Sequence, residues 1–447
     1  MSGLFSRIHR AFSPKARLRA AIAAAAEGRA ADVITVLSKA AAKGHPEAQY
    51  RLGKSYLEAT GVPPSRSAAS VWLERAAQAD VIEAQALLAA LFLTGAGRAD
   101  EGAVAAGLFK DVDSGEPDFA KGLLWGERAA VAGSAEAQAL VGYIRSAGPE
   151  EFRDQEAADR WYAKSAAAGC PQGALGHGLA LMRVAASPDD RGRAIAQIAR
   201  AAKAHLPLGV YLLGVLLEAG AGVEKDERSA VQLFREAANL GLRPAQARLG
   251  LALMEGRGAD RDLINGESWL RRAALAGDAE AAALVGDLYG RGGASPPNFA
   301  EAAAWYGRAA EAGHSTAARA LGTLYLTGAG VARDPEQAAH WLRVASEGGD
   351  RVARTDLANL VLAGSAERQD GDKAREWFAS AAEGGDLVAA YNYGVCLAEG
   401  IGGTRDLEAA AQWLRRAADG VVNAQFWYGR MLCEGRGVDA DQAEGRS

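Results

Sequence analysis

Residues 315–349 read STAARALGTLYLTGAGVARDPEQAAHWLRVASEGG, and this stretch decides the fold. Apolar residues recur at three- and four-residue spacing on both sides of the central GAGV, which predicts two amphipathic helices joined by a short turn. Asp334 opens the second helix, because its side-chain oxygen can accept a free backbone N–H of the first turn. We call the first helix of such a pair the A helix and the second the B helix.

The same pair recurs along the chain with a period of 36 residues. Tryptophan marks the period, with gaps of 36 or 108, at Trp125, Trp161, Trp269, Trp305, Trp341, Trp377 and Trp413. Trp72 precedes this series at a distance of 53, so an insertion of 17 residues falls within about residues 98–117. Internal periodicity of this length is typical of helical repeat proteins.

Three further columns keep the period. Paired alanines follow the tryptophan column by four and five places, as in Ala273 and Ala274. The A helices carry a mid-helix glycine, which costs roughly 0.5–1 kcal/mol relative to alanine and so indicates packing too close for a Cβ atom; these glycines are Gly53, Gly142, Gly178, Gly214, Gly250, Gly286, Gly322 and Gly394. The B helices are preceded by capping residues, namely Ser65, Asp118, Asp154, Asp190, Asp226, Asp262, Asn298, Asp334, Asp370 and Asp406, with Asp441 in the last repeat. We interpret the tryptophans as core and the aspartates as helix caps.

Counting the pairs predicts four segments. Residues 46–422 hold ten repeats, a degenerate capping pair occupies residues 14–45, and a half repeat occupies residues 423–447. Residues 1–13 form a basic amphipathic or flexible N-terminus. No single pair can bury its own apolar face, so the repeats must share one continuous core.

The period, the GxGV turn, the capping aspartate and the tryptophan–alanine pattern of the B helix resemble the Sel-1-like repeat family, a relative of the tetratricopeptide repeats. The resemblance covers nearly the whole chain. It departs at residues 171–206, which lack the tryptophan and the GxGV turn, and at Ala358, which replaces the column glycine. The resemblance implies an all-α fold, a right-handed α-α superhelix of about ten to eleven repeats, whose concave wall is built mostly of A helices. It also implies a scaffold or adaptor in bacterial signalling or in assembly of envelope, secretion or polysaccharide machinery.

Composition and motifs disfavour other classes. The net charge of −5 disfavours nucleic-acid binding. The three cysteines, Cys170, Cys396 and Cys433, form no CxxC and predict neither disulfides nor zinc, which favours a reducing, cytoplasmic location. We expect Cys170 to be exposed and the other two to lie in the core. No HExxH motif or nucleophile–base pair stands out, so we predict no enzyme, no cofactor and no metal; a hydrolase, as assigned to a few family members, is the alternative.

The candidate partner-binding residues are exposed side chains expected on the A-helix wall: Arg51, Arg248, Tyr391, Asn392, Phe426 and Trp427. A protein or peptide partner would lie along that wall, because aromatic and arginine side chains are enriched at binding hot spots. The alternative is that the C-terminal aromatics seal the end of the stack. A second alternative is a membrane-surface role for the segment around Leu4, Phe5, Ile8 and Phe12, whose basic neighbours could face anionic lipid.

Overall fold

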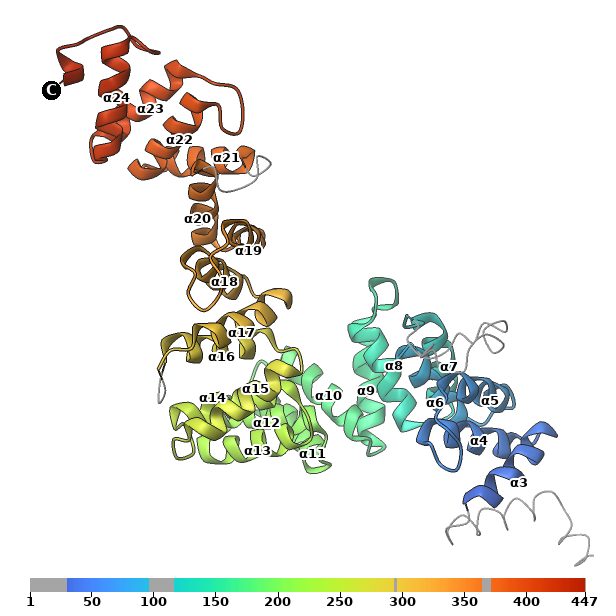
Figure 1. Ribbon diagram of the computed structural model, residues 1–447. Helices are drawn as coiled ribbons and strands as arrows, with labels where there is room; N and C mark the ends of the chain where they lie inside the picture. The colour runs from blue at the N-terminus through green and yellow to red at the C-terminus, as the bar shows by residue number, and fades with distance from the viewer. Residues whose placement is uncertain (1–29, 96–115, 293–295, 364–370, 447) are drawn as a thin grey trace, which may run out of the picture. The chain divides into compact units, whose positions relative to one another are not determined.

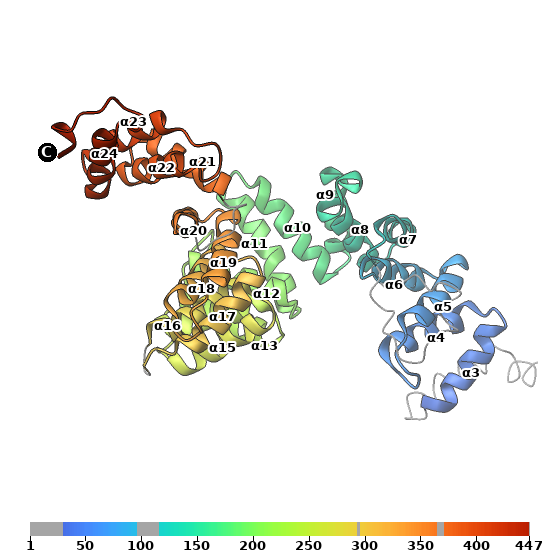
Figure 2. The same ribbon diagram turned by 45° about the horizontal axis from the view of Figure 1, so that its top comes forward.

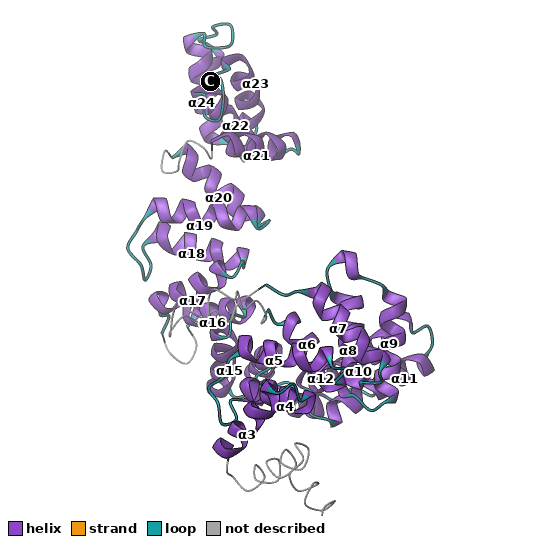
Figure 3. Cartoon of the chain, turned by 90° about the vertical axis from the view of Figure 1, so that its right-hand side faces the viewer, coloured by secondary structure: helices purple, strands orange, loops and turns teal. Residues whose placement is uncertain are grey.

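The computed structural model describes residues 30–95, 116–292, 296–363 and 371–446 of the chain. This part is built from twenty-two α-helices, α3 to α24, and contains no β-strand (Figures 1 and 3). The all-α prediction is therefore confirmed. Even-numbered helices are A helices and odd-numbered helices are B helices, and within each of the two units described below an A helix packs against the B helix that follows it. Residues 1–29 and 96–115 lie outside the described residues, and with them the N-terminal segment and nearly all of the insertion.

The chain divides into two compact units, Met1–Leu233 and Phe234–Ser447. Unit 1 contains α3 (Ala30–Ala42), α4 (Pro46–Glu58), α5 (Arg66–Gln78), α6 (Ile82–Leu93), α7 (Phe119–Val131), α8 (Ala135–Ala147), α9 (Gln155–Ala167), α10 (Pro171–Val184), α11 (Pro188–Lys203) and α12 (Pro207–Ala219), with a short 3₁₀ turn at Glu150–Phe152. The division falls within α13 (Glu227–Asn239).

Unit 2 contains α14 (Arg243–Glu255), α15 (Leu263–Leu275), α16 (Ala279–Arg291), α17 (Phe299–Glu311), α18 (Ser315–Thr327), α19 (Pro335–Glu347), α20 (Arg351–Leu362), α21 (Gly371–Glu383), α22 (Leu387–Glu399), α23 (Leu407–Ala418) and α24 (Val422–Glu434). A 3₁₀ turn follows at Glu444–Arg446. Consecutive helices contact one another, as α22, α23 and α24 do in Figure 2. None of the described helices has both the length and the apolar content that crossing a membrane requires.

The capping column begins the B helices as predicted. The side chain accepts a backbone N–H from three residues ahead at 2.9–3.2 Å at Ser65, Asp118, Asp154, Asp226, Asp262, Asn298, Asp334 and Asp406. Asp190 is an exception. Helix α11 begins earlier, at Pro188, because Ser187 caps it and Asp190 completes a capping box from inside the first turn. Asp441 caps only the terminal 3₁₀ turn, and Asp370 lies outside the described residues.

The glycine column closes each A helix onto its B helix. A Cβ added to these glycines would lie 2.6–3.0 Å from the nearest heavy atom of the facing B helix at Gly53, Gly142, Gly178, Gly250, Gly286, Gly322 and Gly394. Such a distance is shorter than real Cβ contacts, so the predicted close packing is confirmed at these positions. At Ala358 a Cβ is present, and α20 and α21 make the least extensive contact of the A–B pairs within either unit.

Among the large side chains, the residue after the tryptophan position is more buried than the tryptophan in most repeats. Trp125 and Trp305 are buried, at 7% and 6% exposure, whereas the other tryptophans of the series are half-buried. The following residue is at most 2% exposed at Leu73, Leu270, Leu342 and Leu414, and so are Ile198 and Phe234, which follow Gln197 and Leu233 at the tryptophan position. The core prediction for the tryptophans therefore holds fully at two positions and in part at the others. Indole is large, so it spans from the core to the surface of its helix pair.

The cysteines differ from expectation at one position. Cys170 is 5% exposed, because it stands at the N-cap of α10 with its thiol turned toward Gln172, so its predicted exposure is wrong. Cys396 is fully buried, and this burial raises the pKa of its thiol to about 11. Cys433 is half-buried.

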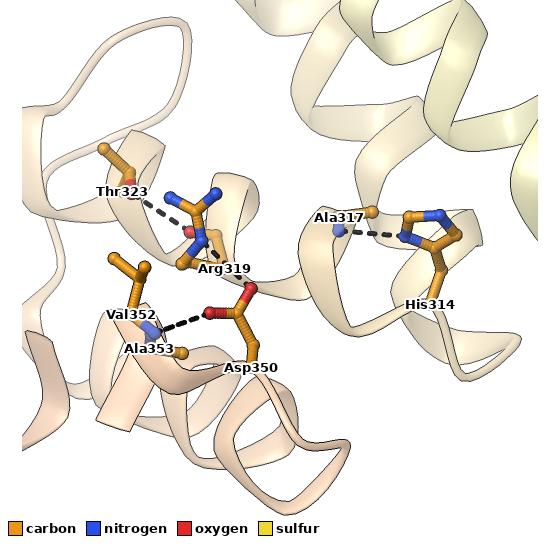
Figure 4. Close-up of polar contacts among 7 residues, drawn as sticks. All are labelled: His314, Ala317, Arg319, Thr323, Asp350, Val352 and Ala353. Carbon is orange, nitrogen blue, oxygen red and sulfur yellow. Dashed lines mark hydrogen bonds and ion pairs between the residues drawn. The ribbon is translucent and has the colours of Figure 1, made fainter. Parts of the chain in front are cut away.

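Polar contacts connect consecutive A helices of unit 2 at their N-terminal ends (Figure 4). His314 caps α18, where its Nδ1 accepts the Ala317 N–H, and its Nε2 lies 3.0 Å from a carboxylate oxygen of Glu280 in α16. Arg319 of α18 donates from Nε to Asp350 at 3.1 Å, and the other carboxylate oxygen of Asp350 caps α20. The carboxylate of Asp350 thus caps α20 and also binds Arg319 of the preceding repeat.

This double role predicts unequal costs for two cap deletions. Asp350→Ala and Asp386→Ala each remove a cap with two backbone N–H donors, which costs about 1 kcal/mol. Asp350→Ala also leaves Arg319 without its partner, so we expect it to lower the free energy of unfolding by about 1 kcal/mol more. Urea denaturation followed by circular dichroism measures the difference. Equal costs would show that the ion pair adds nothing to stability.

Candidate partner-binding site

Six of the eight tryptophans of the B helices have a cation over the ring, supplied by the residue three places further along the same helix. The charged group lies 4.5–5.7 Å from the ring centroid in the pairs Trp72–Arg75, Trp125–Arg128, Trp161–Lys164, Trp269–Arg272, Trp305–Arg308 and Trp413–Arg416. A helix places residues three apart on one face, so each of these repeats covers its own indole with a cation–π contact.

Two tryptophans lack this cation. Val344 follows Trp341 at the same spacing, and both side chains pack against a hydrophobic cluster. Ser380 follows Trp377, and a serine side chain is too short to reach across an indole ring. Trp377 packs against the neighbouring hydrophobic clusters and is half-buried, but no cation of its own helix lies over its ring.

A cavity of about 390 Å³ lies at this position. Helix α21 contributes Trp377, Phe378, Ser380 and Ala381 to its lining. The flanking A helices contribute the rest: Arg351, Arg354, Thr355 and Ala358 from α20, and Asp386, Val388, Ala389 and Asn392 from the start of α22. We call this cavity the Trp377 pocket. All of its lining residues belong to unit 2.

Two guanidinium groups at the Trp377 pocket have no partner among the described residues. Arg351 is exposed and Arg354 is half-buried, and neither side chain makes a hydrogen bond or ion pair within the described part of the chain. Their counterparts 108 residues earlier are engaged. Arg243 donates to the carbonyls of Ala276 and Gly277, and Gln246 donates to the carbonyl of Ala238.

The position of Arg354 holds glutamine in several other repeats. The glutamine amide donates to a carbonyl at the end of the preceding B helix at Gln49, Gln85, Gln138, Gln246 and Gln425. Arg354 therefore lacks the hydrogen bond that glutamine makes to the preceding B helix, and it adds a positive charge to the pocket. This exchange favours a binding role over a structural one.

Two of the other polar side chains that line the pocket, Asp386 and Asn392, are hydrogen-bonded within the protein. Asp386 is its only lining carboxylate, and one of its oxygens accepts the N–H groups of Val388 and Ala389 at the N-terminus of α22. Asn392 is 7% exposed and donates to the side chain of Asn359. The two arginines are thus the charged groups left to bind a partner, beside the hydroxyl groups of Thr355 and Ser380.

Exposed apolar side chains lie on the A helices that flank the pocket and on the A helix that follows them. Val352 at the start of α20 is 54% exposed, and Val388 at the start of α22 is 59% exposed. Val422 and Phe426 of α24 are 76% and 68% exposed. Aliphatic and aromatic groups at this exposure on consecutive A helices give a partner apolar surface to bury.

The structure places the candidate residues from the sequence in different settings. Arg51 is paired with Glu47 at 2.6 Å, and Arg248 lies 5.8 Å from the ring centroid of buried Phe234. Of the C-terminal residues, Asn392 is buried rather than exposed because it packs on Asn359 across the pocket floor, and it is the only one of the six candidates in the Trp377 pocket. Phe426 is exposed, whereas Tyr391 and Trp427 are half-buried against the C-terminal core cluster.

Sequence reasoning missed Trp377, Ser380, Arg351 and Arg354. The signal was present, since six of the eight B-helix tryptophans carry Arg or Lys at the third following position and serine stands out there. Among the described residues no cluster of three or more His, Cys, Asp or Glu side chains is arranged to hold a metal ion. Two other cavities, of about 620 and 350 Å³, border residues 96–115 and 293–295, which the structure does not describe.

Helix pairs that repeat every 36 residues define a helical-repeat protein of the tetratricopeptide-like class. The Sel1 repeat family model matches residues 46–81, 82–110, 135–170, 207–242, 243–278, 279–314, 315–350, 352–386, 387–420 and 422–447. The chain therefore belongs to the Sel1 repeat family, whose members are generally protein-interaction scaffolds. The pair α10–α11 is not matched, in keeping with its missing tryptophan and turn motif.

A solved structure agrees with this assignment. A protective antigen present in uropathogenic Escherichia coli strains, which displays the Sel1-like fold, is 27% identical over 92% of this chain and 85% of its own, with a TM-score of 0.54. A Sel1 repeat protein from Oxalobacter formigenes is 26% identical over 72% of this chain and 89% of its own, with a TM-score of 0.49. No curated protein sequence matches the chain significantly.

Proposed function

We propose that this chain is a non-catalytic scaffold that binds a protein or peptide partner on the A-helix wall of unit 2, with the Trp377 pocket as the anchoring point. The observation that carries the proposal is the ring of Trp377, which lines a cavity and lacks the cation that lies over the tryptophan in six other repeats. Aromatic rings and arginines in a partly enclosed pocket are the usual composition of binding hot spots.

The setting of this scaffold is part of the proposal. The similar structures come from bacteria, which supports a bacterial role in signalling or in assembly of envelope, secretion or polysaccharide machinery. The cysteines are all unpaired, which supports a reducing compartment such as the cytoplasm.

Ser380→Arg tests the pocket directly. The substitution restores the cation that the other repeats place over their tryptophan, so we expect the protein to fold normally and the pocket to be filled. A partner anchored at the pocket should lose at least about 30-fold in affinity, the size of a hot-spot loss. The measurement is affinity purification with quantitative mass spectrometry on wild type and variant, with thermal unfolding as the check on folding.

Arg272→Ser is the matched control. It uncovers Trp269 in α15 by the reverse exchange and leaves the Trp377 pocket untouched. Partners recovered with wild type should be retained by Arg272→Ser and depleted by Ser380→Arg. Full retention of every partner by folded Ser380→Arg would overturn the proposed site.

A further inference from the structure

We infer that the Trp377 pocket receives the carboxylate of an aspartate or glutamate side chain, from a partner segment whose neighbouring residue is apolar. This inference rests on the proposed function and names the chemistry of the partner at the same site. It follows from the charges that line the pocket and from the apolar side chains beside it.

The charges of the pocket lining indicate whether the bound group is an anion or a cation. The lining carries two guanidinium groups, Arg351 and Arg354, against one carboxylate, Asp386, which is already engaged as a helix cap. The nearby carboxylate of Asp350 is bound to Arg319 and does not neutralise them. An anion therefore finds two free donors, and guanidinium groups bind carboxylates with particularly favourable geometry.

The same charges exclude the alternative that the bound group is a cation lying over the ring of Trp377. A cation over Trp377 would imitate the contacts of the other repeats, where the charged group sits 4.5–5.7 Å from the ring. In those pairs the cation belongs to the helix that carries the tryptophan, although Arg271 of α15 also lies 5.6 Å from the ring centroid of Trp305 in α17. A cation arriving from a partner would meet Arg351 and Arg354, which carry the same charge and have no counter-ion among the described residues.

Apolar contacts beside the pocket require that the residue next to the bound carboxylate be apolar. Val388 lines the pocket and is 59% exposed, and the ring of Trp377 lines the same cavity. Val352 extends this apolar surface to the start of α20, at 54% exposure. A carboxylate bound to the arginines would place a neighbouring aliphatic or aromatic side chain against these groups, where burial stabilises the complex.

Random dodecapeptides displayed on phage provide the probe. Selection on the wild-type full-length chain, after depletion on Ser380→Arg, enriches peptides that depend on the open pocket. We expect these peptides to share an Asp or Glu next to an apolar residue. A synthetic copy of the best peptide and its Asn or Gln counterpart are then compared by fluorescence anisotropy, and the acid form should bind about tenfold to a hundredfold more tightly.

Arg354→Gln identifies the receiving group. It installs the side chain that five other repeats carry at this position, so folding should be preserved. The variant should weaken the acid peptide about tenfold and leave its amide counterpart unchanged. Arg243→Gln, at the counterpart of Arg351 in α14, should change neither.

The outcomes separate the inference from the proposed function. Pocket-dependent peptides that lack acidic residues, or that bind equally as acid and amide, would overturn the carboxylate inference and leave the binding site standing. Peptides that bind wild type and Ser380→Arg alike, or a failure to enrich any peptide, would count against the site itself and so against both.

Discussion

Replacing Leu270 by alanine is expected to lower the free energy of unfolding by about 2–5 kcal/mol. Leu270 is fully buried in α15, at the centre of a core cluster that joins α15, α16 and α17. Its Cγ lies 2.8 Å from where a Cβ of Gly250 would stand, so the side chain fills the space that the glycine leaves free. Truncation removes this side chain from a tightly closed contact that can relax only in part. Urea denaturation followed by circular dichroism measures the loss.

Leu275→Ala is the matched control for this prediction. It makes the same chemical change in the same helix at a side chain that is 62% exposed. We expect a change within about 0.5 kcal/mol. Similar costs at both positions would contradict the assignment of the core to the column after the tryptophan.

Gly250→Ala is expected to destabilise the protein by about 1–3 kcal/mol, although alanine is the better helix former. The new Cβ would lie 2.9 Å from the carbonyl oxygen of Gly266 and 3.0 Å from the backbone nitrogen of Leu270. Backbone atoms cannot move aside as a side-chain tip can, so α14 and α15 must separate. The midpoint of urea unfolding reports the change.

Gly192→Ala shows what the same substitution does without a neighbour. Gly192 lies within α11, and a Cβ there meets nothing within 4 Å. We expect this variant to be stabilised by about 0.5–1 kcal/mol through helix propensity alone. If both glycine variants gained stability, close packing would not be the reason for the glycine column.

The repeat architecture could be predicted from sequence because each column has one local cause. Asp334 caps a helix through its own side chain, and Gly322 marks a close contact through its own missing Cβ. A cause that lies in the residue itself can be recognised in the sequence, because the same residue type recurs at a fixed spacing. The prediction is wrong where another residue caps the helix. At α11 the cap is Ser187 instead of Asp190, so the helix begins at Pro188, three residues earlier than predicted.

The candidate site is harder to predict, because it is defined by a residue type that is missing from a pattern, namely the cation three places after the tryptophan. Asn392 was selected as an exposed anchor, but its exposure depends on Asn359 one repeat earlier, which only the packing of α20 against α22 reveals. Trp377 was classified as core with its column. Its difference from Trp269 depends on the residue three places later, arginine in one repeat and serine in the other.

The cation–tryptophan pairs separate the residues that hold a repeat together from those that decide whether it is available for binding. Leu270 and Gly250 keep α14 and α15 together whether or not Arg272 lies over Trp269. A surface side chain can therefore be exchanged at the third position after a tryptophan while caps and helix contacts stay as they are. In a chain built by duplication, such an exchange would cover or uncover the tryptophan of one repeat in a single mutational step, with the scaffold unchanged.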